Sequence, residues 1–231
     1  MYCVSRRNNE MAIEAYEDLI KKCLRCSLCK WIPQILIKSQ KYASVCPSID
    51  EFNFHQYSGG GKNILAHSLL LKRIKPSREL AEVIFKCTTC GGCAMACKYL
   101  NDLEPLDLIL ELRELLVNEG CAPMEKHVKY GESVEKVHNP YGEKHEDRLS
   151  WIPDDIKLTK GAKIVYYVGC TSSYRRKEIA IATARILTKA EVKFDILEDE
   201  QCCGSPLLRT GQKALYKKLP FTKKIEEILH I

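Results

Sequence analysis

Apolar positions in the first half of the chain follow the period of an α-helix. Residues 10–22 place four apolar side chains on one helix face, namely Ile13, Tyr16, Leu19 and Ile20. Similar patterns predict helices over residues 62–73, over residues 77–85 with a serine as N-cap, and from Pro105 to a stop at Gly120. No strand pattern is evident before residue 160, so this half is predicted to be helical.

The pattern changes after residue 160. "KIVYYVGC" (163–170) predicts a buried strand, "YRRKEIAIATARILTKA" (174–190) an amphipathic helix and "VKFDILE" (192–198) a second strand. Residues 211–229 are predicted to be helical again, with a break at Pro220. A strand, a helix and a strand in this order predict a βαβ unit with parallel strands.

Residues 121–160 lie between these two regions and show no clear period. They are rich in histidine, proline, glycine and charge, which is typical of a linker packed onto a surface or of a disordered tether. Tyr130, Tyr141 and Trp151 favour the packed linker, because large aromatic side chains indicate that parts of the segment are buried.

The composition is that of an ordinary soluble protein, with 231 residues of which 45% are hydrophobic and 29% charged. The net charge of +6 is too small and too scattered to indicate a nucleic-acid partner. No apolar run is long enough to cross a bilayer, and no apolar stretch of an export signal follows Arg6 and Arg7. We therefore expect a cytoplasmic protein, attached to a membrane only peripherally and through a partner.

Cysteine is the residue type that changes this picture. The chain has 13 cysteines, and clustered cysteines in a reducing compartment point to metal rather than to disulfides. One group reads "CTTCGGCAMAC" and has the C-x2-C-x2-C-x3-C spacing of bacterial ferredoxins, with Cys87, Cys90, Cys93 and Cys97. Gly91 and Gly92 let the backbone turn closely around a cluster. Lys98 stands where a proline usually follows the last cysteine.

The other group has the same first three cysteines but a distant fourth. It comprises Cys23, Cys26, Cys29 and Cys46. Sixteen residues separate Cys29 from Cys46, and Pro47 follows directly. We interpret this as an insertion that keeps the ligand. In two-cluster ferredoxins the fourth cysteine of each group binds the other cluster. The spacing therefore predicts one [4Fe–4S] cluster on Cys23, Cys26, Cys29 and Cys97, and a second on Cys87, Cys90, Cys93 and Cys46.

Zinc is the alternative for these cysteines, but structural zinc usually takes two separated C-x-x-C pairs rather than two triplets with remote fourth ligands. Two nucleotide motifs are also rejected. "SGGGKN" (58–63) lacks the first glycine and the final serine or threonine of a phosphate loop. The first turn of the βαβ unit, "GCTSSY", lacks the glycines of a dinucleotide site. The six histidines show no ligand spacing.

Three further cysteines follow the two predicted strands. Cys170 ends the first strand, and the adjacent Cys202 and Cys203 follow the second. A disulfide between neighbours is strained, because their Cα atoms lie about 3.8 Å apart and relaxed bridges need more. The carboxyl ends of parallel strands meet at one edge of a sheet, so these three thiols are predicted to converge on a metal centre.

The cysteine groups together with "YSGGGKN", "NPYGEKHEDR", "YYVGCTSSY" and "CCGSPLLRTG" resemble the family of the D subunit of heterodisulfide reductase, over about residues 16–212. The resemblance implies an α-helical ferredoxin-like domain with two cubane clusters, followed by a cysteine-rich CCG domain. In the family a CCG motif reads C, CC and then C-x-x-C, and two such motifs bind noncubane [4Fe–4S] clusters that reduce a disulfide. Here Cys170, Cys202 and Cys203 match the first three cysteines of one motif.

The closing C-x-x-C and the second motif are missing from the sequence. We therefore expect a third, noncubane cluster only with a completing chain, and we interpret the sequence as one half of a split gene or as a fragment. The expected fold class is α+β. The expected parts are an N-terminal extension (1–15), an α-helical ferredoxin-like domain (16–120), a linker (121–160) and a partial βαβ CCG domain (161–231).

The function predicted from these features is that of an iron–sulfur electron-transfer subunit in an oxidoreductase complex. Electrons would pass through the two cubanes toward the CCG site, and the isolated chain is not expected to be catalytic. Expected partners are a CCG-completing chain, a flavoprotein or a membrane cytochrome. The alternatives are an electron-transfer adaptor for a flavin-dependent 2-hydroxyacid or glycerol-3-phosphate dehydrogenase, and a nonfunctional gene fragment.

Overall fold

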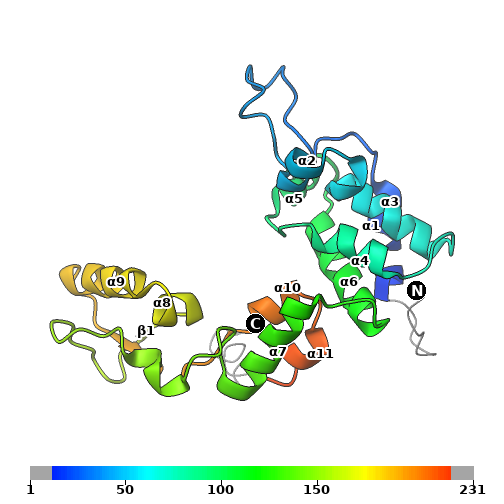
Figure 1. Ribbon diagram of the computed structural model, residues 1–231. Helices are drawn as coiled ribbons and strands as arrows, with labels where there is room; N and C mark the ends of the chain where they lie inside the picture. The colour runs from blue at the N-terminus through cyan, green and yellow to red at the C-terminus, as the bar shows by residue number, and fades with distance from the viewer. Residues whose placement is uncertain (1–11, 220–231) are drawn as a thin grey trace. The chain divides into compact units, whose positions relative to one another are not determined.

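The computed structural model describes residues 12–219 and divides the chain into two compact units (Figure 1). Among these residues, the first unit comprises residues 12–124 and Leu208–Gln212, and the second comprises Glu125–Leu207 and residues 213–219. Most of the described chain is helical, and a two-stranded parallel sheet lies in the second unit. The predicted α+β class is confirmed.

The first unit is built of short helices. In chain order they are η1 (Ala12–Tyr16), α1 (Glu17–Lys22), α2 (Pro47–Phe52), η2 (His55–Tyr57), α3 (Gly59–Leu70), α4 (Arg78–Phe85), α5 (Gly92–Asn101) and α6 (Pro105–Asn118). Helix α3 contacts α1, α6 and η2, and α6 contacts α4 and α5. Their apolar faces enclose one core, which includes Leu69, Ile84, Leu108 and Leu112.

The second unit contains the βαβ arrangement. Its elements are α7 (Glu125–Val137), η3 (His145–Leu149), β1 (Ile164–Tyr166), α8 (Cys170–Tyr174), α9 (Lys177–Lys189), β2 (Phe194–Ile196), α10 (Ser205–Arg209), of which the last two residues belong to the first unit, and α11 (Lys213–Tyr216). Strands β1 and β2 pair in parallel, with Ile164 opposite Phe194 and Tyr166 opposite Ile196. Ala180 and Ala184 of α9 pack with Trp151 and Phe194 in one core.

Several predicted helices have the expected ends. Ser77 caps α4 by accepting a hydrogen bond from the Leu80 amide at 3.2 Å, and α6 begins at Pro105. The helix predicted over residues 62–73 instead starts at Gly59, because Ser58 accepts a hydrogen bond from the Gly61 amide at 2.9 Å and so caps it earlier. Residues 10 and 11 of the first predicted helix lie outside the described residues.

Two expectations about the second half are corrected. Helix α7 lies in a stretch in which no helix was predicted. The sequence did not reveal it because its narrow buried face, with Gly131 and Val134, gives little apolar periodicity. The strand predicted to be buried is largely open, since Ile164 and Val165 are 50% and 43% exposed. The helix predicted over residues 211–229 begins as α11, and its part from residue 220 onward lies outside the described residues.

Candidate metal centres

Four of the predicted ligands line one cavity of the first unit, called here the first cavity. They are Cys23, Cys26, Cys29 and Cys97. Cys23 follows the end of α1, and the chain then turns sharply through Arg25 and Ser27, which have positive φ angles of 56° and 68°. These turns direct three cysteines of one loop toward the same space, and α5 supplies the fourth.

The other four ligands line a second cavity in the same unit. They are Cys46, Cys87, Cys90 and Cys93. Cys46 is the N-cap residue of α2, and the loop after α4 carries Cys87 and Cys90. This loop turns at Thr89 and Gly91, whose φ angles are 53° and 78°. The structure therefore gathers the eight cysteines into two sets of four, and each set combines three cysteines of one sequence group with the fourth of the other.

The glycine-rich start of α3 lies between the two cavities. Gly59 lines both of them, and a Cβ atom on it would lie 2.8 Å from Cβ of Cys93 and 3.5 Å from Cβ of Cys29. The amide of Gly60 donates a hydrogen bond to Sγ of Cys29 at 3.3 Å. Gly59 of the stretch "SGGGKN" thus has a structural reason, because a side chain there would collide with Cys93 where the helix passes the cysteines.

The thiolate forms of the partly buried Cys93 and Cys97 are unfavourable without a bound metal. Burial and then repulsion by the neighbouring thiolates raise the pKa of Cys93 to about 12, and burial and the thiolates of Cys29, Cys23 and Cys26 raise the pKa of Cys97 to about 11. Metal binding relieves this repulsion because it takes up the thiolate charge. Within residues 12–219 no three acidic, histidine or cysteine side chains gather closely enough to hold a single metal ion. The cysteines surround cavities instead, which suits a group of several atoms.

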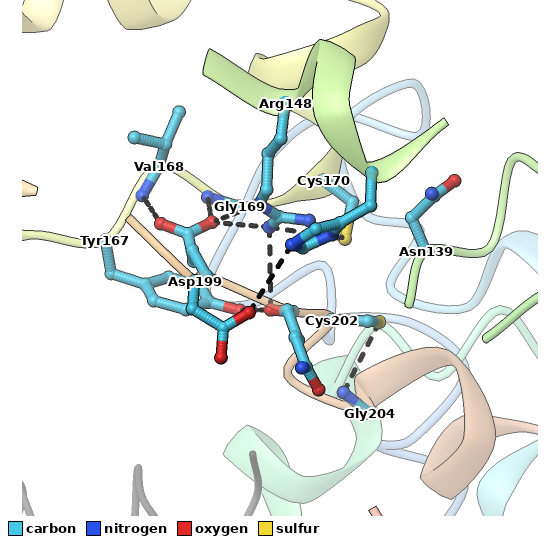
Figure 2. Close-up of polar contacts among 12 residues, drawn as sticks. Asn139, Arg148, Tyr167, Val168, Gly169, Cys170, Asp199, Cys202 and Gly204 are labelled. Carbon is cyan, nitrogen blue, oxygen red and sulfur yellow. Dashed lines mark hydrogen bonds and ion pairs between the residues drawn. The ribbon is translucent and has the colours of Figure 1, made fainter. Parts of the chain in front are cut away.

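The remaining three predicted ligands also meet, in the second unit. The three thiols act on one another, and those of Cys170 and Cys203 raise the pKa of the Cys202 thiol. Cys202 is buried, its amide bonds the carbonyl of His138 at 2.9 Å, and its Sγ accepts from the Gly204 amide at 3.4 Å (Figure 2). We call Cys170, Cys202 and Cys203 the three-cysteine site.

A buried ion pair supports this site. Arg148 and Glu200 are each 1% exposed, and the Arg148 guanidinium lies 2.5 Å from the carboxylate. Glu200 also accepts hydrogen bonds from the amides of Val168 and Gly169, at 2.8 and 2.9 Å. The other side of the Arg148 guanidinium faces Sγ of Cys170, at 3.6 and 3.7 Å (Figure 2). A fixed positive charge therefore lies beside a candidate ligand.

The surroundings give the three thiols different pKa values. The hydrogen bond from Cys202 lowers the pKa of Cys170, and attraction to Arg148 lowers it further against the effect of burial. The hydrogen bond from Cys202, with help from the amide of Ser205 and from Tyr167, lowers the pKa of Cys203 to about 6. The neighbouring thiols of Cys170 and Cys203 raise the pKa of Cys202. The lowered pKa values of Cys170 and Cys203 favour the thiolate form, which is the form that binds metal.

Sequence reasoning did not assign the charged side chains beside the sites. Lys62, Arg113, Arg148 and Glu200 are all buried, at 1%, 4%, 1% and 1% exposure. Charged residues are usually exposed, so their spacing in the sequence carries no signal of this kind. The one available sign was that Lys62 and Arg148 fall inside the stretches "YSGGGKN" and "NPYGEKHEDR" that carry the family resemblance.

Two family models match the chain, one in each half. Residues 19–100 match the model of the 4Fe-4S dicluster domain, and residues 164–230 match that of the cysteine-rich domain called CCG. No solved structure matches. Within residues 12–219, no helix combines the length and the apolar character that crossing a membrane requires.

Three curated relatives illustrate the likeness. The chain is 37% identical over 209 residues to the D subunit of the dihydromethanophenazine:CoB–CoM heterodisulfide reductase of Methanosarcina mazei, a match that covers 88% of this chain and 50% of that protein. It is 32% identical over 139 residues to the B subunit of the fumarate reductase (CoM/CoB) of Methanothermobacter marburgensis, covering 60% and 27%. It is 31% identical over 152 residues to the EtfAB:quinone oxidoreductase of Syntrophomonas wolfei, covering 60% and 21%.

The chain spans about half the length of the heterodisulfide reductase relatives that it matches. The match nevertheless includes both domains, and the dicluster domain implies two [4Fe–4S] clusters. The chain is therefore an iron–sulfur protein like the D subunit of heterodisulfide reductase, in which a 4Fe-4S dicluster domain precedes a cysteine-rich CCG domain.

Proposed function

We propose that the chain is the electron-transfer subunit of an oxidoreductase complex of the heterodisulfide reductase type. Its two [4Fe–4S] clusters accept electrons from a partner and pass them on toward the cysteine-rich domain. The observation that carries this proposal is the pair of cavities, because each is lined by four cysteines and the two lie side by side along α3. The Methanosarcina relatives, which are named as parts of a heterodisulfide reductase, support it.

The proposed ligand sets follow the cavities. One cluster is held by Cys23, Cys26, Cys29 and Cys97, and the other by Cys46, Cys87, Cys90 and Cys93. The chain positions these thiolates, keeps side chains out of the space at Gly59, and donates the amide of Gly60 to Cys29. When bound, the clusters supply one-electron chemistry at potentials that the surrounding charges and hydrogen bonds set.

The ligand sets are tested by exchanging the fourth ligands. Anaerobically purified protein should contain about eight iron atoms per chain, because each cubane holds four. Cys97→Ser should change the EPR signal of the cluster bound by Cys23, Cys26 and Cys29, and Cys46→Ser should change the other signal. A colourless protein with zinc, or variants in which each substitution affects only the cluster of its own sequence group, would contradict the proposal.

We assign the three-cysteine site to a third cluster that needs further ligands. The three cysteines with a buried cation beside them form only part of a cluster site, because the family motif implied by the sequence uses five cysteines. The chain by itself should therefore hold two clusters and should not reduce a disulfide substrate. Iron well above eight atoms per chain, together with disulfide reduction by the purified chain alone, would overturn this assignment.

A second candidate function is that of an adaptor that serves a flavoprotein partner without using the three-cysteine site. The likeness to the EtfAB:quinone oxidoreductase favours it. Cys203→Ala separates the two candidates when the chain is assembled with its partners. Loss of electron delivery with both cubanes intact supports the heterodisulfide reductase type, and unchanged electron delivery supports the adaptor.

A further inference from the structure

Two buried cations lie at the second cavity and have no carboxylate partner in the described part of the chain. Lys62 lines the cavity and is 1% exposed, and its ammonium donates a hydrogen bond to the carbonyl of Tyr57. The charged groups that act on it are those of Cys87, Cys46, Cys93 and Arg113, and none is an Asp or Glu. A lysine with this burial and without a counter-ion is costly unless an anion occupies the cavity beside it.

The second cation approaches Cys87 from α6. The Arg113 guanidinium is 4% exposed, donates to the carbonyl of Cys87 at 2.5 Å, and also donates to the carbonyl of Arg209. The Arg209 guanidinium in turn bonds Oγ1 of Thr89 at 2.9 Å, so both arginines are fixed against the loop that carries the ligands. The anionic group that acts on Arg113 is Cys87, and no carboxylate does so among the described residues.

The first cavity has no comparable charge among the described residues. Its counterpart to Lys62 is the next residue of α3, the neutral Asn63, whose amide nitrogen donates to the carbonyl of Ile20 at 2.9 Å. Arg25 also lines the first cavity but is exposed, so water screens its charge. His55 lines it as well, and burial and then Lys30 lower its pKa, which disfavours a positive charge there.

Backbone hydrogen bonds do not offset this difference, because each ligand set receives one of similar length. The amide of Gly60 donates to Cys29 at 3.3 Å, and the amide of Thr89 donates to Cys87 at 3.4 Å. Adding an electron makes a cysteine-bound cubane more negative, and a fixed cation in a poorly solvated site stabilises that state more strongly than an exposed one. The buried charges therefore decide which cluster is easier to reduce.

We propose that Lys62 and Arg113 raise the reduction potential of the cluster at the second cavity above that of the cluster at the first. This inference rests on the ligand sets proposed above. It fixes the direction of flow: one electron passes from the first cluster, which is oxidised, to the second, which is reduced, and no bond or proton is exchanged. The electron enters at the first cavity from a reduced partner of the complex.

The test uses the full chain with both clusters loaded and an EPR-monitored redox titration. Lys62→Met removes the charge but keeps most of the apolar stem, and it should shift the second cluster to a lower midpoint potential while the first cluster keeps its own. Lys86→Met is the matched control, because Lys86 precedes the ligand Cys87 and carries the same charge but is exposed. It should leave both potentials unchanged. Equal shifts in the two variants, or a shift confined to the first cluster, would overturn the proposal.

A second measurement keeps the proposal testable if Lys62→Met loads too little iron. In the unchanged protein, the cluster that is reduced first should be the one whose signal Cys46→Ser alters. If the cluster altered by Cys97→Ser is reduced first, the inference is wrong while the ligand sets stand. If the cysteine variants do not sort the two signals in this way, the proposed ligand sets themselves fail.

Discussion

Among single residues, Glu200 joins several parts of the second unit. Its carboxylate accepts from Arg148 and from the amides of Val168 and Gly169, directly before Cys170. This one side chain therefore fixes both the end of the first strand region and the cation beside the three-cysteine site. Nothing in the local sequence distinguishes Glu200 from its acidic neighbours Glu198 and Asp199, which are exposed. Only the packed structure identifies the residue that matters.

Glu200→Gln should destabilise the second unit by about 3–5 kcal/mol, because it leaves the buried Arg148 charge without its partner. Urea unfolding followed by Trp151 fluorescence measures this when the other tryptophan is removed by Trp31→Phe, since Trp151 is 2% exposed in the core of that unit. Asp155→Asn is the control. It breaks the ion pair with Arg185, in which the Arg185 and Asp155 side chains are 58% and 57% exposed, and should cost less than about 1 kcal/mol. Equal losses in the two variants would show that the buried pair carries no special weight.

Among the elements, α3 begins at Gly59, three residues before the start that the sequence predicted. The three glycines in its first turn are unfavourable for a helix, because glycine costs about 1 kcal/mol relative to alanine within a helix. The structure gives the compensating reason: α3 must pass close to η2 and to the cysteines. A Cβ atom on Gly61 would lie 2.0 Å from the carbonyl oxygen of His55 and 2.6 Å from Cα of Gln56.

Gly61→Ala should therefore destabilise the first unit by about 3 kcal/mol or more, because backbone atoms cannot move aside as a side chain can. Gly60→Ala provides the comparison. Its Cβ atom would meet nothing closer than 3.4 Å, so the gain in helix propensity should leave stability unchanged or raised by up to about 1 kcal/mol. Urea unfolding followed by circular dichroism measures both, and two equally stable variants would contradict the close approach.

The start of α4 offers a milder test of an element. Ser77 caps this helix, which leads directly into the loop of Cys87, by accepting the amide of Leu80. Ser77→Ala should cost about 1 kcal/mol, the usual value of a lost N-cap. Ser77→Asp should restore most of that loss, because a carboxylate caps as well as a hydroxyl. Unfolding free energies of the three proteins measure the effect, and a Ser77→Asp variant as unstable as Ser77→Ala would contradict it.

At the scale of the whole molecule, the sequence predicts the order of the domains better than it predicts which charged side chains are buried. The spacing of cysteines is a local feature of the sequence, so the two cluster-binding groups could be predicted. The βαβ order could be predicted from the local apolar pattern. The buried cations could not, because the burial of Lys62 or Arg113 depends on helices far apart in the sequence. Helix α7 was missed because Val134 and Gly131 alone give no clear period. The boundaries of the four expected parts stay predictions.

Removal of iron should affect the two units differently. Both cavities lie in the first unit, so ligand binding there adds to its folding free energy, whereas the core around Trp151 belongs to the second. In a Trp31→Phe background, a chelator should therefore lower the unfolding midpoint seen by far-ultraviolet circular dichroism and leave the transition seen by Trp151 fluorescence unchanged. A parallel fall of both transitions would show that the two units unfold together.

Helix α5 has a consequence for how the protein is filled with its cofactors in the cell. It carries Cys93, which lines the second cavity, and Cys97, one turn later, which lines the first. Whichever cluster arrives first fixes the helix in position and thereby presents a ready ligand to the next. Loading should be cooperative, so that limited iron gives a mixture of empty and full chains and few half-filled ones. A maturation system that delivers clusters to this protein would then fill both sites in effectively one event rather than in two independent ones.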